Sequence, residues 1–228
     1  MSGRPEGLLL VDKPAGITSH DVVLIARRAY GEKSIGHLGT LDPFATGLLM
    51  LLLGRSTRLA TFIETEPKVY EATICFGAET DTDDSTGSVI REAPIPSQDA
   101  VAAAIPAFAG IIEQVPPDYS AKSVEGVRAY DAARKGAALE LAPVQVEVHE
   151  WKVRRHDERS MDVIITCGTG TYIRALARDL GRAVGSAAHL TSLRRTRSGE
   201  FDVEQAVTVG QLKLDPPPLL RLSVVASR

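Results

Sequence analysis

The chain has 228 residues, of which 44% are hydrophobic and 24% charged, and its formal net charge is −3. These proportions exclude collagen, a coiled coil and wholesale disorder. Its two cysteines, Cys75 and Cys167, form no CxxC pair, which excludes a zinc ribbon and a dense disulfide framework. The longest apolar run, residues 47–53, is far shorter than the roughly 20 residues of a membrane helix, so we expect a cytoplasmic protein.

The charges are unevenly distributed along the chain. Residues 64–99 hold nine acids and two bases, whereas residues 150–198 hold ten bases and five acids. This asymmetry predicts a basic face that binds phosphates, with chance clustering on a solvated surface as the alternative.

The first elements are predicted from short, clear signals. Residues 7–11 are apolar and form a strand. Thr18 and Asp21 have the spacing of a capping box, so a helix is expected from there to about Tyr30. Gly31 supplies its stop signal.

Strands are expected to dominate the rest of the chain. A glycine-rich loop over 36–47 leads into 48–53, which is apolar throughout and is predicted to be a strand buried on both faces. Further strands are predicted over 69–76, 144–154, 160–167 and, with a loop as the alternative, 190–198; helices are predicted over 97–105, 127–135, 172–184 and 207–214. Because helices occur irregularly between the strands, the predicted fold class is α+β, or mixed α/β.

Asp42 is the one acid between Glu32 and Glu64, and it lies where the loop enters the most apolar strand. A carboxylate in such a place needs a partner or a function. Asp-Pro is also a common turn opener, and spacing alone favours that interpretation. His37, five residues earlier, allows an acid–base pair, for which a lone histidine beside a lone aspartate is weak evidence.

Six segments carry further motifs, and they follow one another over residues 7–201: GLLLVDKPAGITSHDVV, GHLGTLDPFATGLL, KVYEATICFGAETDTDDSTG, PPDYSAKSVEGVRAYDAAR, CGTGTYIRALARDLG and LRRTRSGEF. All six, in this order, resemble the motifs of TruB-type tRNA pseudouridine synthases. The second, which contains Asp42, resembles the catalytic motif of that family.

The resemblance implies a pseudouridine-synthase-like core, with a largely antiparallel sheet flanked by helices and a thumb-like insertion over about 106–142. It also implies that uridine is isomerised to pseudouridine in the T-arm of tRNA, at position 55, by an aspartate carboxylate and base flipping. The family uses no metal and no cofactor, and tRNA is the implied partner. A monomer without an obligate protein partner or a membrane is the default expectation.

The resemblance assigns roles to single residues. Asp42 is the implied catalytic carboxylate, Arg174 its cationic partner, and Tyr70 the aromatic ring that stacks on the flipped uracil. His37 is implied to fill the gap that the flipped base leaves. The implied substrate-binding set also includes Tyr172, Leu193, Lys13 and Pro14.

Contacts with the RNA backbone are predicted for five basic residues, namely Arg178, Arg194, Arg195, Arg197 and Lys122. Since Arg174, Arg178 and Arg182 recur every four residues, a solvent-facing helical stripe is the alternative for Arg178 and Arg182. Thr169 and Ser123 occupy positions at which the family often has a basic residue, which puts the affinity for RNA in doubt more than the chemistry.

Many family members end in a separate RNA-binding PUA domain. Only 29 residues follow Gly199 here, so we expect a single catalytic domain over 1–228 with a short extension over about 200–228, either as a naturally short form or as a truncated chain. The alternative function is an RNA-binding or tRNA-folding module whose catalysis is dispensable. Such a module needs a basic face and the His37 loop but not Asp42.

Overall fold

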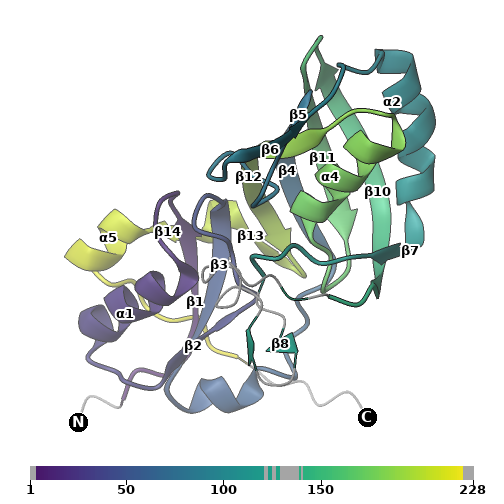
Figure 1. Cartoon of the computed structure of the whole chain (residues 1–228). Helices are drawn as coiled ribbons and strands as arrows, with labels where there is room; N and C mark the ends of the chain where they lie inside the picture. Colours follow the sequence, from purple (N-terminus) through teal and green to yellow (C-terminus); the bar gives the residue numbers. More distant parts are fainter. Residues whose placement is uncertain (1–3, 121–122, 125–126, 129–138, 140, 223–228) are drawn as a thin grey trace. The chain divides into compact units, whose positions relative to one another are not determined.

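The computed structural model describes residues 4–120, 123–124, 127–128, 139 and 141–222 (Figure 1). The chain divides into two compact units. The first consists of Met1–Lys68 together with Arg194–Arg228, and the second is the continuous stretch Val69–Leu193. In the described part of the chain, no helix has both the length and the apolar character needed to cross a membrane.

The first unit is built around strand β3 (Thr46–Leu53), which pairs antiparallel with β1 (Gly7–Lys13). Leu53 lies opposite Gly7 at one end of this pairing, and Gly47 lies opposite Lys13 at the other. The other edge of β3 has two partners. Strand β2 (Ile35–Leu38) pairs antiparallel with residues 50–53, and β12 (Ala188–Ser198) pairs in parallel with residues 46 and 47. Short β14 (Val207–Thr208) pairs in parallel with β1. Residues 39–45, which include Asp42, therefore form the connection between β2 and β3.

Strand β3 is buried on both faces, as its unbroken apolar sequence predicts. On one face Leu48, Met50 and Leu52 pack with Leu8 and Leu10 of β1 into a core cluster. The intervening leucines of β3 are also buried. The base of the Asp42 loop is thus fixed in a closely packed core.

Helix α1 (Ser19–Tyr30) follows β1 and has the predicted capping box at Thr18 and Asp21. Gly31 caps its end in the left-handed conformation, with φ of 63°. The other helical elements of this unit are η1 (Gly54–Leu59), η3 (Val203–Gln205) and α5 (Val209–Leu214), and β13 (Phe201–Asp202) pairs with the end of β12.

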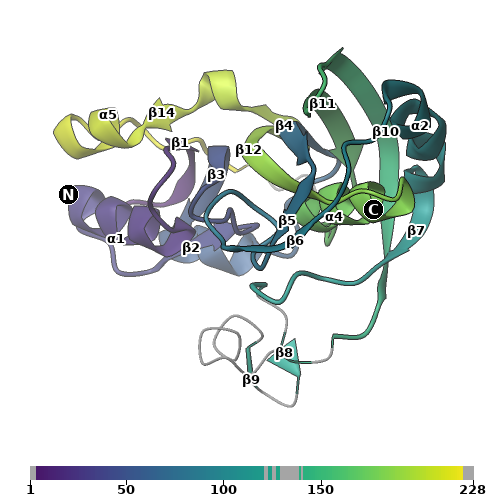
Figure 2. The same ribbon diagram turned by 45° about the horizontal axis from the view of Figure 1, so that its top comes forward.

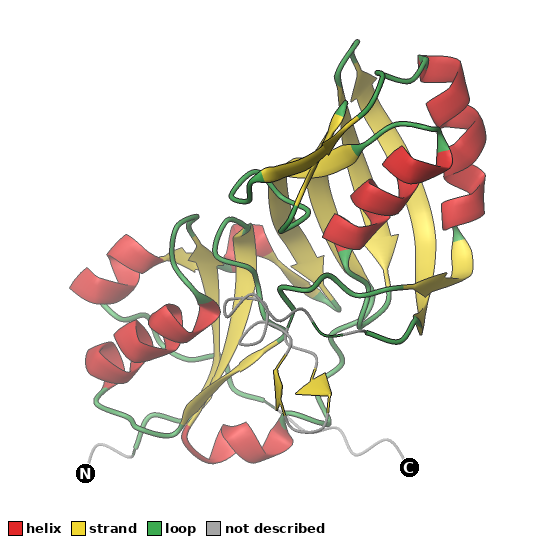
Figure 3. Ribbon diagram, viewed as in Figure 1, coloured by secondary structure: helices red, strands yellow, loops and turns green. Residues whose placement is uncertain are grey.

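The strands of the second unit are hydrogen-bonded in the order β12 (its residues 188–193), β4 (Lys68–Phe76), β11 (Ser160–Cys167), β10 (Val144–His156) and β7 (Gly110–Gln114). The pairs β10–β11 and β10–β7 are antiparallel. Helices α2 (Gln98–Ala104) and α4 (Ile173–Ala183) lie against one face of this sheet (Figure 1, and Figure 3 by secondary structure). A hairpin of β5 (Ala78–Thr80) and β6 (Val89–Glu92) and the short helix η2 (Ile105–Phe108) complete the unit.

Most predicted elements are confirmed, with ends that shift by a few residues, and the mixed α/β class with a mostly antiparallel sheet is confirmed too. Three expectations are corrected. The loop expected over 36–47 begins as β2, residues 207 and 208 are a strand before α5, and residues 127 and 128 belong to the small hairpin of β8 (Ser123–Val124) and β9 (Val127–Arg128), which Figure 2 shows most clearly. The rest of the helix predicted over 127–135, much of the thumb-like insertion and Lys122 lie outside the described residues.

Candidate active site

The loop that carries Asp42 is anchored on both sides of that residue. The hydroxyl of Ser19, which is 2% exposed, donates to the carbonyl of Leu41 at 3.0 Å and accepts from the N–H of Leu41 at 2.9 Å. After Asp42, the carbonyl of Pro43 accepts from the N–H of Gly16 at 2.8 Å. Because both neighbours of Asp42 are held by the segment that leads into α1, its carboxylate is presented from a fixed backbone.

Lys13 connects this loop to the end of β1. Its side chain is fully buried, and Nζ donates to the carbonyls of Pro14, Ile17 and Pro43 at 2.9, 2.8 and 3.3 Å. Burial lowers the pKa of Lys13 to about 8, although the Asp42 carboxylate acts in the opposite direction. Lys13 and Asp42 therefore interact as opposite charges within the first unit.

Arg195 is a second buried cation at this loop. Its side chain is 1% exposed, Nε donates to the carbonyl of Leu48 at 2.8 Å, and Nη2 donates to that of Gly39 at 3.1 Å. A contact with an RNA phosphate needs an exposed guanidinium, which Arg195 does not present. The structure thus corrects the expectation that this residue reads the RNA backbone and places it beneath the Asp42 loop.

The remaining predicted residues of the first unit lie on its strands. His37 is half-buried in β2, and burial together with the positive charge of Arg195 lowers its pKa, which favours the neutral ring. Arg194 is partly exposed and holds both carboxylate oxygens of Asp12, at 3.0 and 2.8 Å. Arg197 is exposed, and its Nε donates to the carbonyl of Gly199.

In the second unit, Arg174 lies in the first turn of α4 and is 3% exposed. Its guanidinium donates to the carbonyls of Thr82 and Tyr119, both at 2.8 Å, and lies 3.7 Å from a carboxylate oxygen of Asp84. These partners explain how a cation is accommodated near the positive end of the helix. The orientation of Arg174 is fixed by side-chain and main-chain contacts within its own unit.

Arg174 is the first step of a ladder of ion pairs along α4. One turn later, Arg178 pairs with Asp83 at 3.0 Å and with Asp179 at 2.8 Å and donates to the carbonyl of Val115. After a further turn, Arg182 pairs with Glu79, which also accepts from Arg91.

This ladder changes two expectations. Arg178 is buried, so a solvent-facing stripe is the wrong description for it, whereas Arg182, at 53% exposure, has that character. Arg178 also presents no exposed guanidinium to a phosphate. Part of the positive charge of residues 150–198 is neutralised by acids at 79–84, which reduces the basic face that the charge distribution predicts.

Gln114 fixes the backbone of Tyr172, the N-cap residue of α4. Its side-chain amide accepts from the N–H of Tyr172 at 2.8 Å and donates to the carbonyl of the same residue at 3.1 Å. Gln114 itself is 1% exposed. Tyr70 on β4 and Leu193 on β12 are both buried, so these two predicted pocket residues belong to the packed part of the second unit.

The predicted residues thus fall into two groups, one in each unit. The first unit contains Lys13, Pro14, His37, Asp42 and three arginines of β12, and the second contains Tyr70, Tyr172, Arg174, Arg178 and Leu193. Sequence reasoning missed Ser19, Gln114 and Asp84, which hold predicted residues in place. Ser19 and Asp84 each gave a signal, because they are part of the quoted segments GLLLVDKPAGITSHDVV and KVYEATICFGAETDTDDSTG, whereas Gln114 lies outside the quoted segments.

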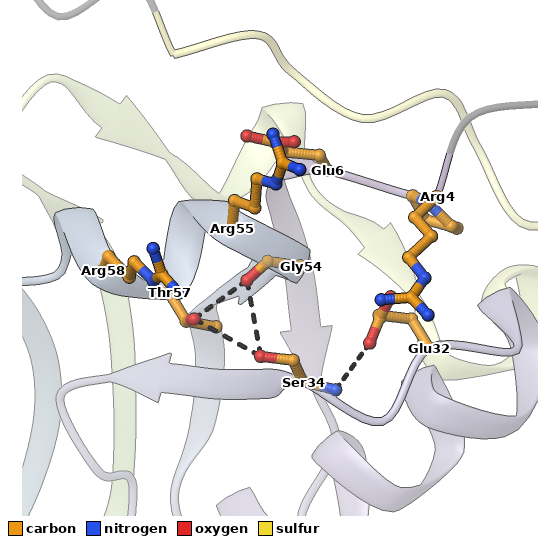
Figure 4. A pocket seen from close by; sticks show the side chains of 9 residues that line it. Arg4, Glu6, Glu32, Ser34, Gly54, Arg55, Thr57 and Arg58 are labelled. Atoms are coloured by element: carbon orange, nitrogen blue, oxygen red, sulfur yellow. Dashed lines mark hydrogen bonds between the residues drawn. The ribbon is translucent and has the colours of Figure 1, made fainter.

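No metal centre is formed by the described residues, in which no three His, Cys, Asp or Glu side chains gather to hold an ion. A polar pocket of about 550 Å³ lies in the first unit, between the start of the chain, the turn after α1 and η1 (Figure 4). It is lined by arginines and glutamates, among them Arg4, Glu32 and Arg58, and by none of the predicted site residues.

Comparison with known proteins gives consistent matches over the chain. Residues 27–173 match the N-terminal domain of the TruB family of pseudouridylate synthases, and residues 174–215 match the C-terminal domain of tRNA pseudouridylate synthase B. The chain is 49% identical to tRNA pseudouridine synthase B of Thermobifida fusca (strain YX), over 91% of the chain and 74% of that protein. It is 48% identical to the protein of the same name from Gloeobacter violaceus (strain ATCC 29082 / PCC 7421), over 91% of the chain and 73% of that protein.

Similar solved structures include a Cbf5-Nop10-Gar1 complex, with a TM-score of 0.70 and 28% identity over 90% of this chain and 53% of that one. A second is an H/ACA RNP bound to a substrate RNA containing 2'-deoxyuridine, with a TM-score of 0.65 and 27% identity over 90% of this chain and 51% of that one. The chain therefore spans about half the length of these structural relatives.

Proposed function

The chain belongs to the TruB family of pseudouridylate synthases, and we propose that it isomerises uridine to pseudouridine in tRNA, at position 55 of the T-arm. The observation that carries this proposal is the anchored loop in which Asp42 is the one acid over a stretch of 31 residues, held by Ser19, Gly16 and Lys13. A carboxylate on a fixed backbone beside a buried cation fits nucleophilic or acid–base work on a ribosyl bond.

In the proposed reaction the bond between N1 of uracil and C1′ of ribose breaks. The uracil then turns in place, and a bond forms between its C5 and C1′. The proton on C5 leaves and N1 gains one, so substrate and product have the same composition. We assign the covalent or acid–base role to Asp42, since the reaction needs a group that stabilises the separated ribose or uracil.

Access to the uridine requires that the base leave the folded RNA. We propose that Tyr70 stacks on the flipped uracil and that Tyr172 and Leu193 line its pocket. His37 fills the gap in the RNA, a role that suits the neutral ring favoured by its lowered pKa. Arg174 supplies positive charge for the Asp42 carboxylate, and the RNA backbone is contacted by Arg197, which is exposed, and by Lys122, which lies outside the described residues.

The proposed partner is the T-arm stem-loop of tRNA, bound by a monomer in the cytoplasm without a cofactor. Both units contribute residues to this proposal, so we propose that they act as one catalytic domain. Binding to RNA should weaken as salt rises, because phosphate contacts release counterions.

The test is the release of tritium from 5-tritiated uridine in a T-arm stem-loop, since the isomerisation must free the hydrogen at C5. Wild type should release the label, and Asp42→Asn should release none while its Kd for the RNA stays within about twofold of wild type. Asn has nearly the shape of Asp, so the loop anchors remain.

A matched control is Asp215→Asn, which changes an exposed acid at the end of α5 and should leave release unchanged. If neither wild type nor Asp42→Asn releases tritium although both fold and bind the RNA, the binding-module alternative replaces the enzyme. If Asp42→Asn releases it at the wild-type rate, Asp42 is not the catalytic carboxylate.

A further inference from the structure

Arg195 occupies a gap between two strand pairings. On the same edge of β3, β12 pairs with Thr46 and Gly47, and β2 pairs with Met50 onward. Leu48 lies between these two registers, and its carbonyl accepts from Nε of Arg195 at 2.8 Å. A buried carbonyl without a donor is costly, so the guanidinium supplies the hydrogen bond that a strand would supply elsewhere.

The same guanidinium reaches the other end of the Asp42 loop. Nη2 donates to the carbonyl of Gly39 at 3.1 Å, just after β2 ends. A Cβ on Gly39 would lie 3.3 Å from Nη1 of Arg195, and one on Gly47 would lie 2.2 Å from the main-chain oxygen of Arg195. Both glycines have positive φ, which disfavours other residues, and any Cβ would crowd the Arg195 guanidinium at Gly39 and clash with the Arg195 main chain at Gly47.

The buried charge of Arg195 also acts on the loop. It lowers the pKa of both Lys13 and His37, while the Asp42 carboxylate raises the pKa of Lys13. Arginine side chains in proteins carry their charge permanently, whereas burial lowers the pKa of Lys13 to about 8. Arg195 is thus a permanent positive charge beneath a loop whose one acid is Asp42.

We propose that Arg195 is a positioning residue for the reaction: it joins the two ends of the Asp42 loop, at Gly39 and Leu48, and places a buried positive charge against that loop. The role in catalysis rests on the proposed function. The role in holding the loop does not, because it follows from the contacts alone.

Two variants separate the hydrogen bonds from the charge. Arg195→Met removes both and keeps an unbranched apolar side chain, and Arg195→Lys keeps the charge but cannot hold two separate carbonyls with the geometry of a guanidinium. Amide hydrogen exchange of residues 39–48 reports the loop and needs no RNA. Single-turnover tritium release at saturating RNA, followed against pH, reports the chemistry.

In both variants we expect exchange over 39–48 to accelerate by about tenfold or more, with helix α1 unchanged. We expect Arg195→Met to lower the single-turnover rate by about tenfold or more, with a Kd for RNA within about twofold of wild type. The acid limb of its pH–rate profile should move to higher pH, and Arg195→Lys should keep the wild-type limb. Arg155→Met, an exposed arginine of β10, is the control for all these readouts.

A weaker Kd with unchanged exchange and unchanged single-turnover rate would show that Arg195 contacts RNA, and would overturn the proposal. If Arg195→Met does not fold, the test rests on Arg195→Lys. Amide exchange over 39–48 at the wild-type rate in Arg195→Lys would contradict the proposal that Arg195 joins the two loop ends. Absence of turnover in wild type would refute the proposed function, while the exchange measurement would still decide the role of Arg195 in the loop.

Discussion

Nζ of Lys13 lies 3.3 Å from the carbonyl oxygen of Pro43, so the last residue of β1 is bonded to the residue that follows Asp42. Because Lys13 is also fully buried, this contact holds the loop at the expense of desolvating an ammonium group. The consequence can be measured as a dependence of stability on pH.

The stability contributed by Lys13 should rise with pH. Its folded pKa of about 8 lies below the ordinary value of 10.5, so between these values the unfolded chain holds a proton that the folded chain has lost. The free energy of unfolding of wild type minus that of Lys13→Met should therefore increase by about 3 kcal/mol across this window. Urea unfolding at several pH values measures it, with Lys33→Met, an exposed lysine, as the control. A flat difference would mean that Lys13 is not penalised by burial.

Removal of Arg178 should destabilise the second unit strongly. Arg178→Met leaves the carboxylate of Asp83, which is 6% exposed, without its guanidinium partner, and we expect a loss of about 3 to 5 kcal/mol near neutral pH. Arg155→Met breaks an exposed pair with Asp157 and should cost less than about 1 kcal/mol. Equal losses of stability in the two variants would contradict the conclusion that the buried pair of Arg178 and Asp83 stabilises the second unit.

The loss caused by Arg178→Met should also shrink as the pH falls. Burial raises the pKa of Asp83 to about 6 even though Arg178 opposes the shift, so removing Arg178 raises this pKa further. Below the pKa the carboxyl is neutral and needs no cation, whereas above it an unpaired charge is buried. Urea unfolding at about pH 5 and about pH 8 should give the larger loss at the higher pH.

Gly47→Ala should damage the fold far more than Gly36→Ala. At Gly47 the φ is +102°, and a Cβ would lie 2.2 Å from the main-chain oxygen of Arg195 on the paired strand. We expect a loss of about 2 to 5 kcal/mol in the free energy of unfolding. At Gly36 nothing lies within 4 Å of the new atom, so the effect should stay within about 0.5 kcal/mol. Similar unfolding midpoints for the two variants would be evidence against the close strand contact.

Arg174→Lys tests the geometry of a buried arginine in the proposed site. Lysine keeps the positive charge but cannot donate to the carbonyls of Thr82 and Tyr119 while facing Asp84. We expect tritium release in a single turnover to fall by about 100-fold, with RNA binding retained. Arg182→Lys is the matched control two turns along α4, and its rate should remain within about threefold of wild type. Normal turnover in Arg174→Lys would remove Arg174 from the proposed mechanism.

The parts of the fold that were predicted correctly have strong local signals. The unbroken apolar run of β3, the capping box at Thr18 and the spacing of apolar residues in α4 each require no knowledge of distant segments. Strand β2 was missed because its glycine and histidine suit a loop, and its pairing with β3 decides its conformation. The division into two units depends on contacts between residues far apart in sequence.

The candidate site was likewise only partly predictable from the sequence. The motif around Asp42 is readable from the sequence, but the environments of the arginines are not. Arg178 and Arg195 have the residue type of a phosphate contact, yet their partners are Asp83 and two main-chain carbonyls contributed by other elements. Only the tertiary structure distinguishes a buried guanidinium that holds a loop from an exposed one that faces RNA.

Because the first unit is built from two separate stretches of the chain, it is completed later in synthesis than the second unit. Strand β1 bonds to Leu220 through both main-chain groups of Leu8 and pairs with residues 207 and 208, so these contacts can form only after residues 207–220 have been synthesised. The second unit is one continuous stretch and leaves the ribosome whole before them. A nascent chain that has released the whole second unit therefore still lacks the residues that pair with the outer edge of β1, and the first unit is completed only once residues 207–220 have been synthesised.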